Sequence, residues 1–218
     1  MANATDAGLQ EIREALSLAR ISTYEQAAGA GAAEAVELYA WNAQVSAAFL
    51  LPLHIVEVVT RNAATEGIET LYGPRWPWSH GFELSLPDTQ RGYMPRRDLR
   101  GARRNQPTAG KVIPELKFMF WQKIFTARFD ARLWEPQILG LFPNSSHTDA
   151  ASVRGQVYGD LERIRLLRNR IAHHEPIFAR DLTTDLETIV ELVRFRSTAT
   201  ADWLLHHEAV TDLLNQHP

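Results

Sequence analysis

The sequence predicts an all-α protein whose core is an antiparallel helical bundle. Apolar residues recur at helical spacing through most of the 218 residues, and no segment shows the apolar and polar alternation that is typical of a strand. Hydrophobic residues make up 45% of the chain, as in a soluble globular protein. The length fits one large domain, so we expect residues 1–218 to form a single helical domain.

The first third of the chain predicts three helices. The first spans residues 6–20 and ends at a short break over residues 21–23, where a hydroxyl can cap the next helix. The second covers residues 24–42, which are rich in Ala and Glu and are interrupted by two glycines. The third covers residues 42–70 and is the longest apolar segment, so we expect a central core helix that Pro52 bends or divides.

An irregular insertion is predicted over residues 72–110. Prolines and glycines punctuate residues 72–95, so regular structure should be short there. A basic run follows over residues 96–106, before a turn at residues 107–110. Several aromatic residues indicate that the insertion is packed rather than disordered, namely Trp76, Trp78, Phe82 and Tyr93.

Four further helices are predicted over residues 114–133, 147–174, 182–196 and 200–216. The first of these is strongly amphipathic, and Pro136 and Pro143 mark the loop that follows it. The second is long and stops just before Pro176. The last two lie in an acidic C-terminal segment, residues 181–218.

Charge is unevenly distributed along the chain, although the formal net charge is only −3. Residues 1–70 hold three basic and nine acidic side chains, and residues 181–218 hold two basic and seven acidic ones. Residues 91–111 instead hold seven basic and one acidic, and residues 161–180 hold five basic and two acidic. Because binding depends on the local field, these two positive segments leave nucleic-acid binding open.

The sequence contains no cysteine, which excludes disulfides and thiolate metal sites. The N-terminus has no basic-then-apolar signal pattern, and no apolar run approaches about 18 residues. We therefore expect a cytoplasmic protein that does not enter a membrane.

The segment RLLRNRIAHHEPIF concentrates basic and titratable side chains at the end of a predicted helix. On a helical wheel, the core-facing stripe consists of Leu161, Ile164, Leu167 and Ile171. Asn169 and His173 stand four residues apart and are neighbours on another face. Arg168 lies about 140° around the helix from His173, but its long side chain could reach a common ligand at the helix edge. Pro176 disfavours helical backbone at the residue before it, so the helix should end near His174.

This arrangement suits cleavage of an RNA phosphodiester without a metal. The reaction needs a group that removes the 2′-hydroxyl proton, a group that protonates the leaving oxygen, and positive charge beside the phosphate. Histidine transfers protons near neutral pH, so we expect His173 to act as the acid or base. Arg168 offers a fork of donors to the phosphate oxygens, and Asn169 can orient either partner. The alternative is a solvated helix end, because an arginine five residues before a histidine is a weak pattern.

The segment RNRIAHHEPIF resembles the signature of the abortive-infection Abi-like family, a branch of the HEPN superfamily of helical domains. The superfamily motif is Arg, then Asn, Asp or His, then three residues and a His, which maps onto Arg168, Asn169 and His173. Other segments similar to the Abi-like pattern are ALSLARISTY at 15–24, ELYAWNAQVSAAFL at 37–50, VEVVTRN at 56–62 and GKVIPELKFMFWQKIF at 110–125. The resemblance thus spans most of the chain from about residue 10 to residue 180.

The resemblance implies an antiparallel HEPN-like bundle and a dimer that brings two Arg/His motifs together. It further implies a metal-independent endoribonuclease of antiviral defence or of a toxin–antitoxin system, with an antitoxin protein or RNA as a possible partner. Two positions depart from the pattern. Met119 stands where the pattern has Gly, and Glu175 stands where HEPN toxins controlled by nucleotidylation have a Tyr. The second departure speaks against that mode of control.

Five further residues are expected to support the motif, namely Glu57, Arg61, Asn62, His174 and Glu175. The first three lie close together on the predicted central helix, where the alternative role is an intrahelical ion pair. A charge buried in so apolar a segment needs a partner, which favours a contact with the motif helix. Glu175 could hydrogen-bond a histidine or an arginine and set its orientation.

The basic run predicts a track for the phosphate backbone of RNA. Its expected RNA-binding residues are Arg96, Arg97, Arg100, Arg103, Arg104 and Lys111. The alternatives are a solvated loop and a face that pairs with the acidic N-terminal helices. No metal site is expected, because adjacent helical residues such as His173 and His174 point about 100° apart. No cofactor is expected either, since the chain has no Gly-rich phosphate loop.

Together these features predict a metal-independent endoribonuclease that acts in phage defence or as a toxin. Cleavage through the 2′-hydroxyl would leave a 2′,3′-cyclic phosphate. One histidine per protomer cannot easily be both base and acid, so we expect a homodimer, which supplies two. The alternative is a non-catalytic module that binds RNA, a nucleotide or a protein. A third possibility is a scaffold whose acidic residues 181–218 dock onto a basic partner.

Overall fold

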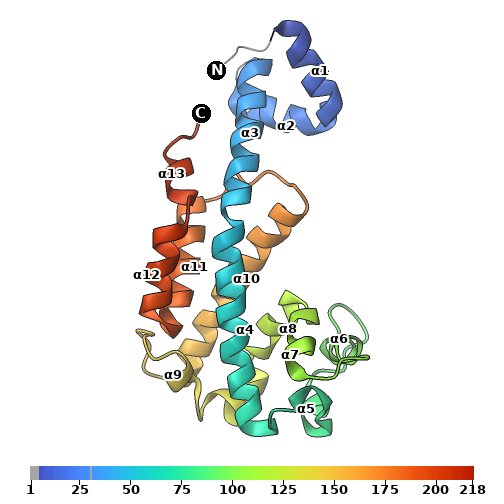
Figure 1. Cartoon of the computed structure of the whole chain (residues 1–218), viewed down its shortest axis with the longest axis vertical. Helices are drawn as coiled ribbons and strands as arrows, with labels where there is room; N and C mark the ends of the chain where they lie inside the picture. The colour runs from blue at the N-terminus through green and yellow to red at the C-terminus, as the bar shows by residue number, and fades with distance from the viewer. Residues whose placement is uncertain (1–4, 30) are drawn as a thin grey trace.

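The computed structural model describes residues 5–29 and 31–218, and the secondary structure over these residues is helical without strands. The all-α prediction is therefore confirmed for the described part of the chain. The helices form an elongated bundle in which α3 (Ala32–Ala48) and α4 (Leu50–Tyr72) run along the long axis (Figure 1). The predicted domain and the second predicted helix also include residues that lie outside the described ranges.

The first two helices, α1 (Asp6–Leu16) and α2 (Leu18–Ala28), meet at Ser17, which corrects the predicted break at residues 21–23. Ser17 has a φ of 72°, and its hydroxyl accepts an amide hydrogen bond from the first turn of α2. It therefore ends one helix and caps the next. Ile21 is fully buried on α2, and the burial of this side chain favours continuous helix where a cap was predicted.

The central segment is divided at Phe49, three residues before Pro52. Pro52 has no amide hydrogen, and its ring crowds the carbonyl four residues earlier, at the end of α3. Phe49 and Val56 are fully buried, so the two helices carry the core along the bundle. Taken together across Phe49, residues Ala32–Tyr72 are long and apolar enough to cross a membrane by length and composition alone, a test that the core helix of a soluble protein also passes.

The predicted insertion over residues 72–110 contains short helices joined by turns. They are η1 (Trp76–Trp78), α5 (His80–Ser85), α6 (Pro95–Ala102) and α7 (Ala109–Val112). The basic run is therefore mostly helical, which corrects the expectation of irregular backbone. Trp76 and Phe82 are fully buried, so the segment is packed as its aromatic content predicted.

The amphipathic stretch over residues 114–133 is a series of short turns rather than the one helix predicted. These are η2 (Ile113–Glu115), α8 (Phe118–Ile124), η3 (Ala127–Phe129) and a π-helical turn η4 (Asp130–Trp134), with α9 (Ile138–Leu141) after them. The Trp134 indole donates to the Ile124 carbonyl at 2.8 Å and so occupies the acceptor that a continuing helix would use. Phe125 also stacks on Trp134, with ring centroids 4.4 Å apart. This aromatic contact folds the chain back on itself.

The last part of the chain contains the motif helix and the helices that pack beside it. They are α10 (Ala150–Ala172), α11 (Leu182–Arg196), α12 (Thr198–His207) and α13 (Val210–Leu214). The first two lie close to their predicted boundaries, whereas the predicted helix over residues 200–216 is two helices. The Glu208 carboxylate accepts hydrogen bonds from the amides of Val210 and Thr211 at 2.5 and 3.0 Å, so it caps a new helix there. In Figure 1, α11 and α12 lie side by side along α4.

Candidate functional site

The motif helix α10 is held by its apolar stripe and ends where the sequence predicted. The four stripe residues, Leu161, Ile164, Leu167 and Ile171, are all buried. Their burial leaves Arg168 and Asn169 half-buried at the helix edge and His173 exposed at the C-cap. The rigid core of α10 thus presents the three motif residues on the surface.

The end of α10 is a Schellman turn built around a residue that is not glycine. The Glu175 amide donates to the Arg170 carbonyl at 2.8 Å, and the His174 amide donates to the Ile171 carbonyl at 3.0 Å. His174 has a φ of 55°, which lies in the left-handed region that glycine prefers. The next residue but one is Pro176, which cannot continue the helix. This turn exposes both histidines of the motif.

A carboxylate on the central helix holds Arg168 in place. Arg168 Nε lies 3.2 Å from Glu57 Oε2, and its guanidinium lies 5.7 Å from the centroid of the Phe118 ring. Arg61, one turn farther along α4, also approaches Glu57 at 3.8 Å. The Arg168 side chain remains 42% exposed, so its outer nitrogens can still donate to a ligand. The structure therefore brings Glu57 and Arg61 together with the motif arginine.

The side chains of Asn169 and His173 make no hydrogen bond to any residue in the described part of the chain. The His173 amide donates to the Asn169 carbonyl at 3.0 Å, so the two residues stand one helical turn apart. Their polar side-chain atoms are free to bind a ligand. No partner fixes the tautomer of His173 within the described protomer.

The other predicted supporting residues lie apart from the motif arginine. Glu175 pairs with Arg170 at 3.7 Å rather than with a motif residue. Asn62 is exposed on α4 and makes no described contact with the motif. The carbonyl of His174 accepts a hydrogen bond from Arg20 Nη1 at 2.6 Å, which ties the helix end to α2.

A hollow of about 370 Å³ beside Arg168 contains a histidine that sequence reasoning missed. The hollow is lined by Leu50, Leu53, His54, Glu57, Arg168, Ile171 and Ala172. His54 is exposed and stands three residues before Glu57, on the same face of α4. The sequence could have indicated His54 through this spacing, because a histidine one helical turn from a predicted site residue lies on the same face.

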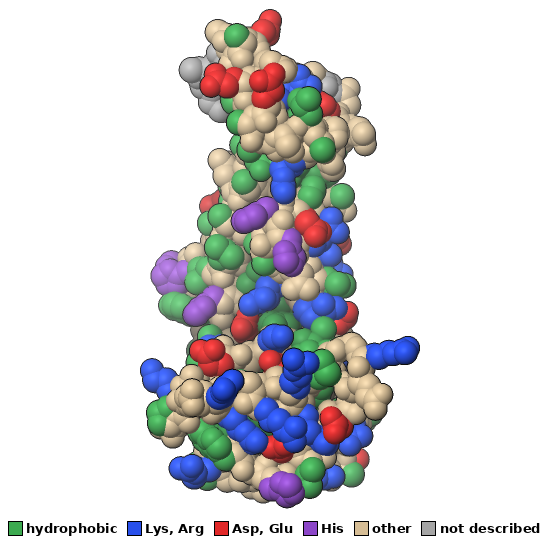
Figure 2. Space-filling model, turned by 90° about the vertical axis from the view of Figure 1, so that its right-hand side faces the viewer, with side chains coloured by type: hydrophobic (Ala, Val, Ile, Leu, Met, Phe, Trp, Pro, Cys, Tyr) green, Lys and Arg blue, Asp and Glu red, His purple; other side chains and the backbone are tan. Residues whose placement is uncertain are grey.

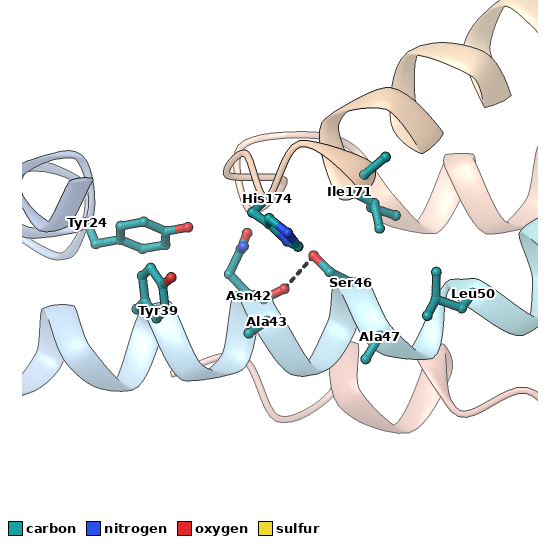
Figure 3. A pocket seen from close by; sticks show the side chains of 10 residues that line it. Tyr24, Tyr39, Asn42, Ala43, Ser46, Ala47, Leu50, Ile171 and His174 are labelled. Atoms are coloured by element: carbon teal, nitrogen blue, oxygen red, sulfur yellow. Dashed lines mark hydrogen bonds between the residues drawn. The ribbon is translucent and has the colours of Figure 1, made fainter. Parts of the chain in front are cut away.

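A second hollow, of about 380 Å³, adjoins the first at the same helix end and is shown in Figure 3. It lies between α2, α3 and the end of α10, and the rings of Tyr24, Tyr39 and His174 line it. No Asp, Glu, Lys or Arg side chain lines this hollow. The two hollows share three lining residues, namely Leu50, Ile171 and Ala172. A charged hollow beside Arg168 and a neutral hollow beside His174 thus meet at the end of α10, and neither is lined by Asn169 or His173.

The predicted RNA-binding residues divide into two groups, of which the first has partners inside the insertion. Arg100 and Arg103 bind the buried carboxylate of Glu83 at 2.6 and 2.5 Å, and Arg96 pairs with Asp88 at 2.7 Å. Burial alone would raise the pKa of Glu83, but hydrogen bonds from its two arginines more than offset this effect and hold its pKa below the ordinary value. These three arginines hold α6 against α5, and their role in RNA binding stays a prediction.

The second group, Arg97, Arg104 and Lys111, is exposed and has no carboxylate partner within residues 5–29 and 31–218. Figure 2 shows Lys and Arg side chains gathered over the end of the molecule that carries α5 to α8. Histidine side chains lie farther along the same face. A polyanion lying along this face would be attracted by the basic end and directed toward the histidines.

Among the residues that the structure describes, no group of three His, Asp or Glu side chains is placed to hold a metal ion. The chain matches no family model, no curated protein and no solved structure. The site geometry and the motif resemblance are therefore the two sources for a functional proposal.

Proposed function

We propose that the protein is a metal-independent endoribonuclease of the HEPN type. The observation that carries this proposal is the position of Arg168, which Glu57 orients at the helix end that also presents Asn169 and His173. A held guanidinium and an exposed imidazole on one helix end can provide charge stabilisation and proton transfer at a phosphate. The resemblance of RNRIAHHEPIF to the Abi-like signature supports the same function.

In the proposed reaction the 2′-oxygen attacks the adjacent phosphorus. A base removes the 2′-hydroxyl proton as the bond from the 2′-oxygen to phosphorus forms, and an acid protonates the 5′-oxygen as its bond to phosphorus breaks. His173 takes one of these two roles, Arg168 donates to the non-bridging oxygens, and Asn169 positions them. The products are a 2′,3′-cyclic phosphate and a 5′-hydroxyl end.

The reaction needs a second proton-transfer group, and a homodimer would supply it as a second His173. Leu50 is 59% exposed beside the motif and offers apolar surface to a second copy of the chain. His54, in the hollow beside Arg168, is an alternative second group from the same protomer. Loss of cleavage in His54→Ala with an unchanged dimer would favour the second arrangement.

Incubation of purified protein with total RNA in EDTA tests the proposal. We expect wild type to cleave, and His173→Ala and Arg168→Ala each to lose about 100-fold or more of the rate. His206→Ala is the matched control, because His206 is an exposed histidine on α12, outside both hollows. Equal cleavage by wild type and His173→Ala, or product ends without a cyclic phosphate, would contradict the proposal.

The second candidate function is a non-catalytic module that binds RNA, a nucleotide or a protein. The observation that favours it is that no described residue hydrogen-bonds the His173 imidazole. A catalytic histidine usually has a partner that fixes its tautomer, whereas a binding residue does not need one. Under this alternative wild type binds RNA without cleaving it, and His173→Ala has no turnover to lose. Gel-shift and cleavage assays on the same preparations separate the two functions.

We base the biological setting on the resemblance alone and propose phage defence or a toxin–antitoxin role in the cytoplasm. RNA, a second copy of the chain and an antitoxin are the corresponding partners. Induced expression of wild type should arrest growth of a bacterial host, and expression of His173→Ala should not. Growth arrest by both proteins would separate toxicity from the proposed nuclease.

A further inference from the structure

The neutral hollow at the end of α10 is lined by a buried tyrosine whose hydroxyl has no hydrogen-bond partner among the described residues. Tyr24 is 1% exposed, and its ring packs against Tyr39 and Phe178 with centroid distances of 5.0 and 5.2 Å. Its hydroxyl makes no hydrogen bond to a described residue and points into the hollow (Figure 3). Burial raises the pKa of Tyr24 to about 12, so the hydroxyl stays protonated and can donate at neutral pH.

A second buried group, Asn42, presents polar hydrogens to the same hollow. Asn42 is 5% exposed, and its Oδ1 accepts from the amides of Ile177 and Phe178 at 2.7 and 3.2 Å. These bonds fix the side chain and leave Nδ2 without an acceptor among the described residues. Ser46 donates to the Asn42 carbonyl at 2.7 Å, so lone pairs of the Ser46 oxygen stay open. The hollow therefore offers fixed donors and a fixed acceptor.

The remaining walls of the hollow are apolar. Apolar side chains form them, namely Ala43, Ala47, Leu50 and Ile171. A nucleobase has two apolar faces and an edge of hydrogen-bonding atoms, and proteins that read unpaired RNA take up bases in such sites. The absence of Asp, Glu, Lys and Arg side chains from the lining disfavours a free ion as the ligand.

We propose that this hollow binds one unpaired base of an RNA strand whose neighbouring phosphate lies at Arg168. The inference rests on the proposed function and adds a substrate class, which is single-stranded RNA. The two hollows share a wall, so a neutral base and a charged phosphate can occupy them together. A base in a continuous duplex cannot enter without unpairing, so duplex RNA should be a poor substrate.

Calorimetric titration with the four ribonucleoside 5′-monophosphates tests base binding without any need for turnover. Ribose 5-phosphate is the comparison probe because it lacks the base. We expect at least one monophosphate to bind wild type roughly tenfold more tightly than ribose 5-phosphate, as base contacts in such sites allow.

Three variants locate the binding. Ala47→Phe places a ring in the hollow and should abolish the preference for the base. Tyr24→Phe keeps the packed ring and deletes only the hydroxyl, so it should weaken monophosphate binding about fivefold, the effect of one hydrogen bond. Gln44→Phe is the matched control, because it adds the same side chain at an exposed position of α3 outside the hollow.

Equal binding of the monophosphates and ribose 5-phosphate would overturn the inference, as would a base preference that survives in Ala47→Phe. A third result would also overturn the inference. If wild type does not bind the monophosphates and Ala47→Phe no longer forms a dimer in light scattering, the hollow is a contact surface for a second copy of the chain. If Ala47→Phe cleaves RNA as fast as wild type, and wild type binds the monophosphates no more tightly than ribose 5-phosphate, the base site would be wrong and the nuclease proposal would stand. Base-dependent binding without RNA cleavage would support the base site and contradict the nuclease proposal.

Discussion

His174 holds the left-handed backbone conformation at the end of α10, with a φ of 55°. A residue with a Cβ is disfavoured there by about 1–2 kcal/mol, and glycine is the usual occupant of this position in a Schellman turn. The imidazole nevertheless lines the neutral hollow. His174 thus has a side chain at a backbone conformation that favours glycine, and backbone strain of this kind is common at functional sites.

The variant His174→Gly should therefore stabilise the protein while it weakens monophosphate binding. Relief of strain should exceed the added entropy of the unfolded chain, so the free energy of unfolding should rise by about 0.5–1 kcal/mol. Urea denaturation measures the stability and calorimetry the affinity. His173→Gly is the control, since His173 has a φ of −96° and gains nothing from glycine. Lower stability in His174→Gly would show that the turn is unstrained.

A second prediction at this scale concerns Asp160 on α10. Burial raises the pKa of Asp160 to about 6; the Gln156 hydrogen bond opposes this shift and the charge of Glu191 adds to it. Because the folded-state pKa is raised, the contribution of Asp160 to stability is complete below its ordinary pKa of 3.8 and is lost as the pH rises through about 6. Asp160→Asn should thus become progressively more stable than wild type between about pH 4 and pH 7. Urea denaturation across this range checks it, and a pH-independent difference would contradict it.

The short helix α6 depends on one carboxylate of its neighbour α5. Glu83 is 7% exposed, and although burial favours its neutral form, hydrogen bonds from Arg100 and Arg103 hold its pKa below the ordinary value. Exposed Arg104 stands beside Arg103 in the sequence but has no such partner among the described residues. Two adjacent arginines of one predicted basic run therefore have different physical roles.

This difference predicts opposite outcomes for Arg103→Gln and Arg104→Gln. The first should lower the free energy of unfolding by about 1–3 kcal/mol, because a buried carboxylate loses one of its two charged partners. The second should leave stability within about 0.5 kcal/mol of wild type and weaken RNA binding, with a shallower dependence on salt. Thermal denaturation and filter binding at several salt concentrations measure both. Equal losses of stability in the two variants would contradict the assignment.

Periodicity located α10 and α11 but failed for the short helices after residue 114, for a physical reason. α10 and α11 each bury one continuous stripe, so their local sequence carries the signal. The stretch after residue 114 is instead shaped by the contact of Trp134 with the Ile124 carbonyl, which no local period records. The candidate site divides in the same way. Spacing and resemblance predicted the motif and Glu57, and the three-residue spacing of His54 from Glu57 was a further local signal, whereas Tyr24 reaches the end of α10 only through the packing of distant helices.

At the scale of the whole molecule, a homodimer with a shared site has a distinctive signature in mixtures. The proposed centre uses His173 from both protomers, one as base and one as acid. In an exchanged equal mixture of wild type and His173→Ala, half of the dimers are mixed and hold a single His173. Only the wild-type dimers, a quarter of the total, keep both histidines, so we expect roughly a quarter of wild-type cleavage. His173→Ala alone should stay inactive, and half of wild-type cleavage would show that one His173 per centre is enough.

The pairing of Glu57 with Arg168 joins residues 111 positions apart in the chain. A ribosome that adds about 5–20 residues per second therefore makes the two halves of the site on the order of ten seconds apart. Throughout that interval the emerging polypeptide carries the α2 and α3 wall of the neutral hollow and the Glu57 carboxylate, but no motif helix. The proposed nuclease, assembled in this order, would have no complete site beside its own message and the ribosome until translation has passed α10.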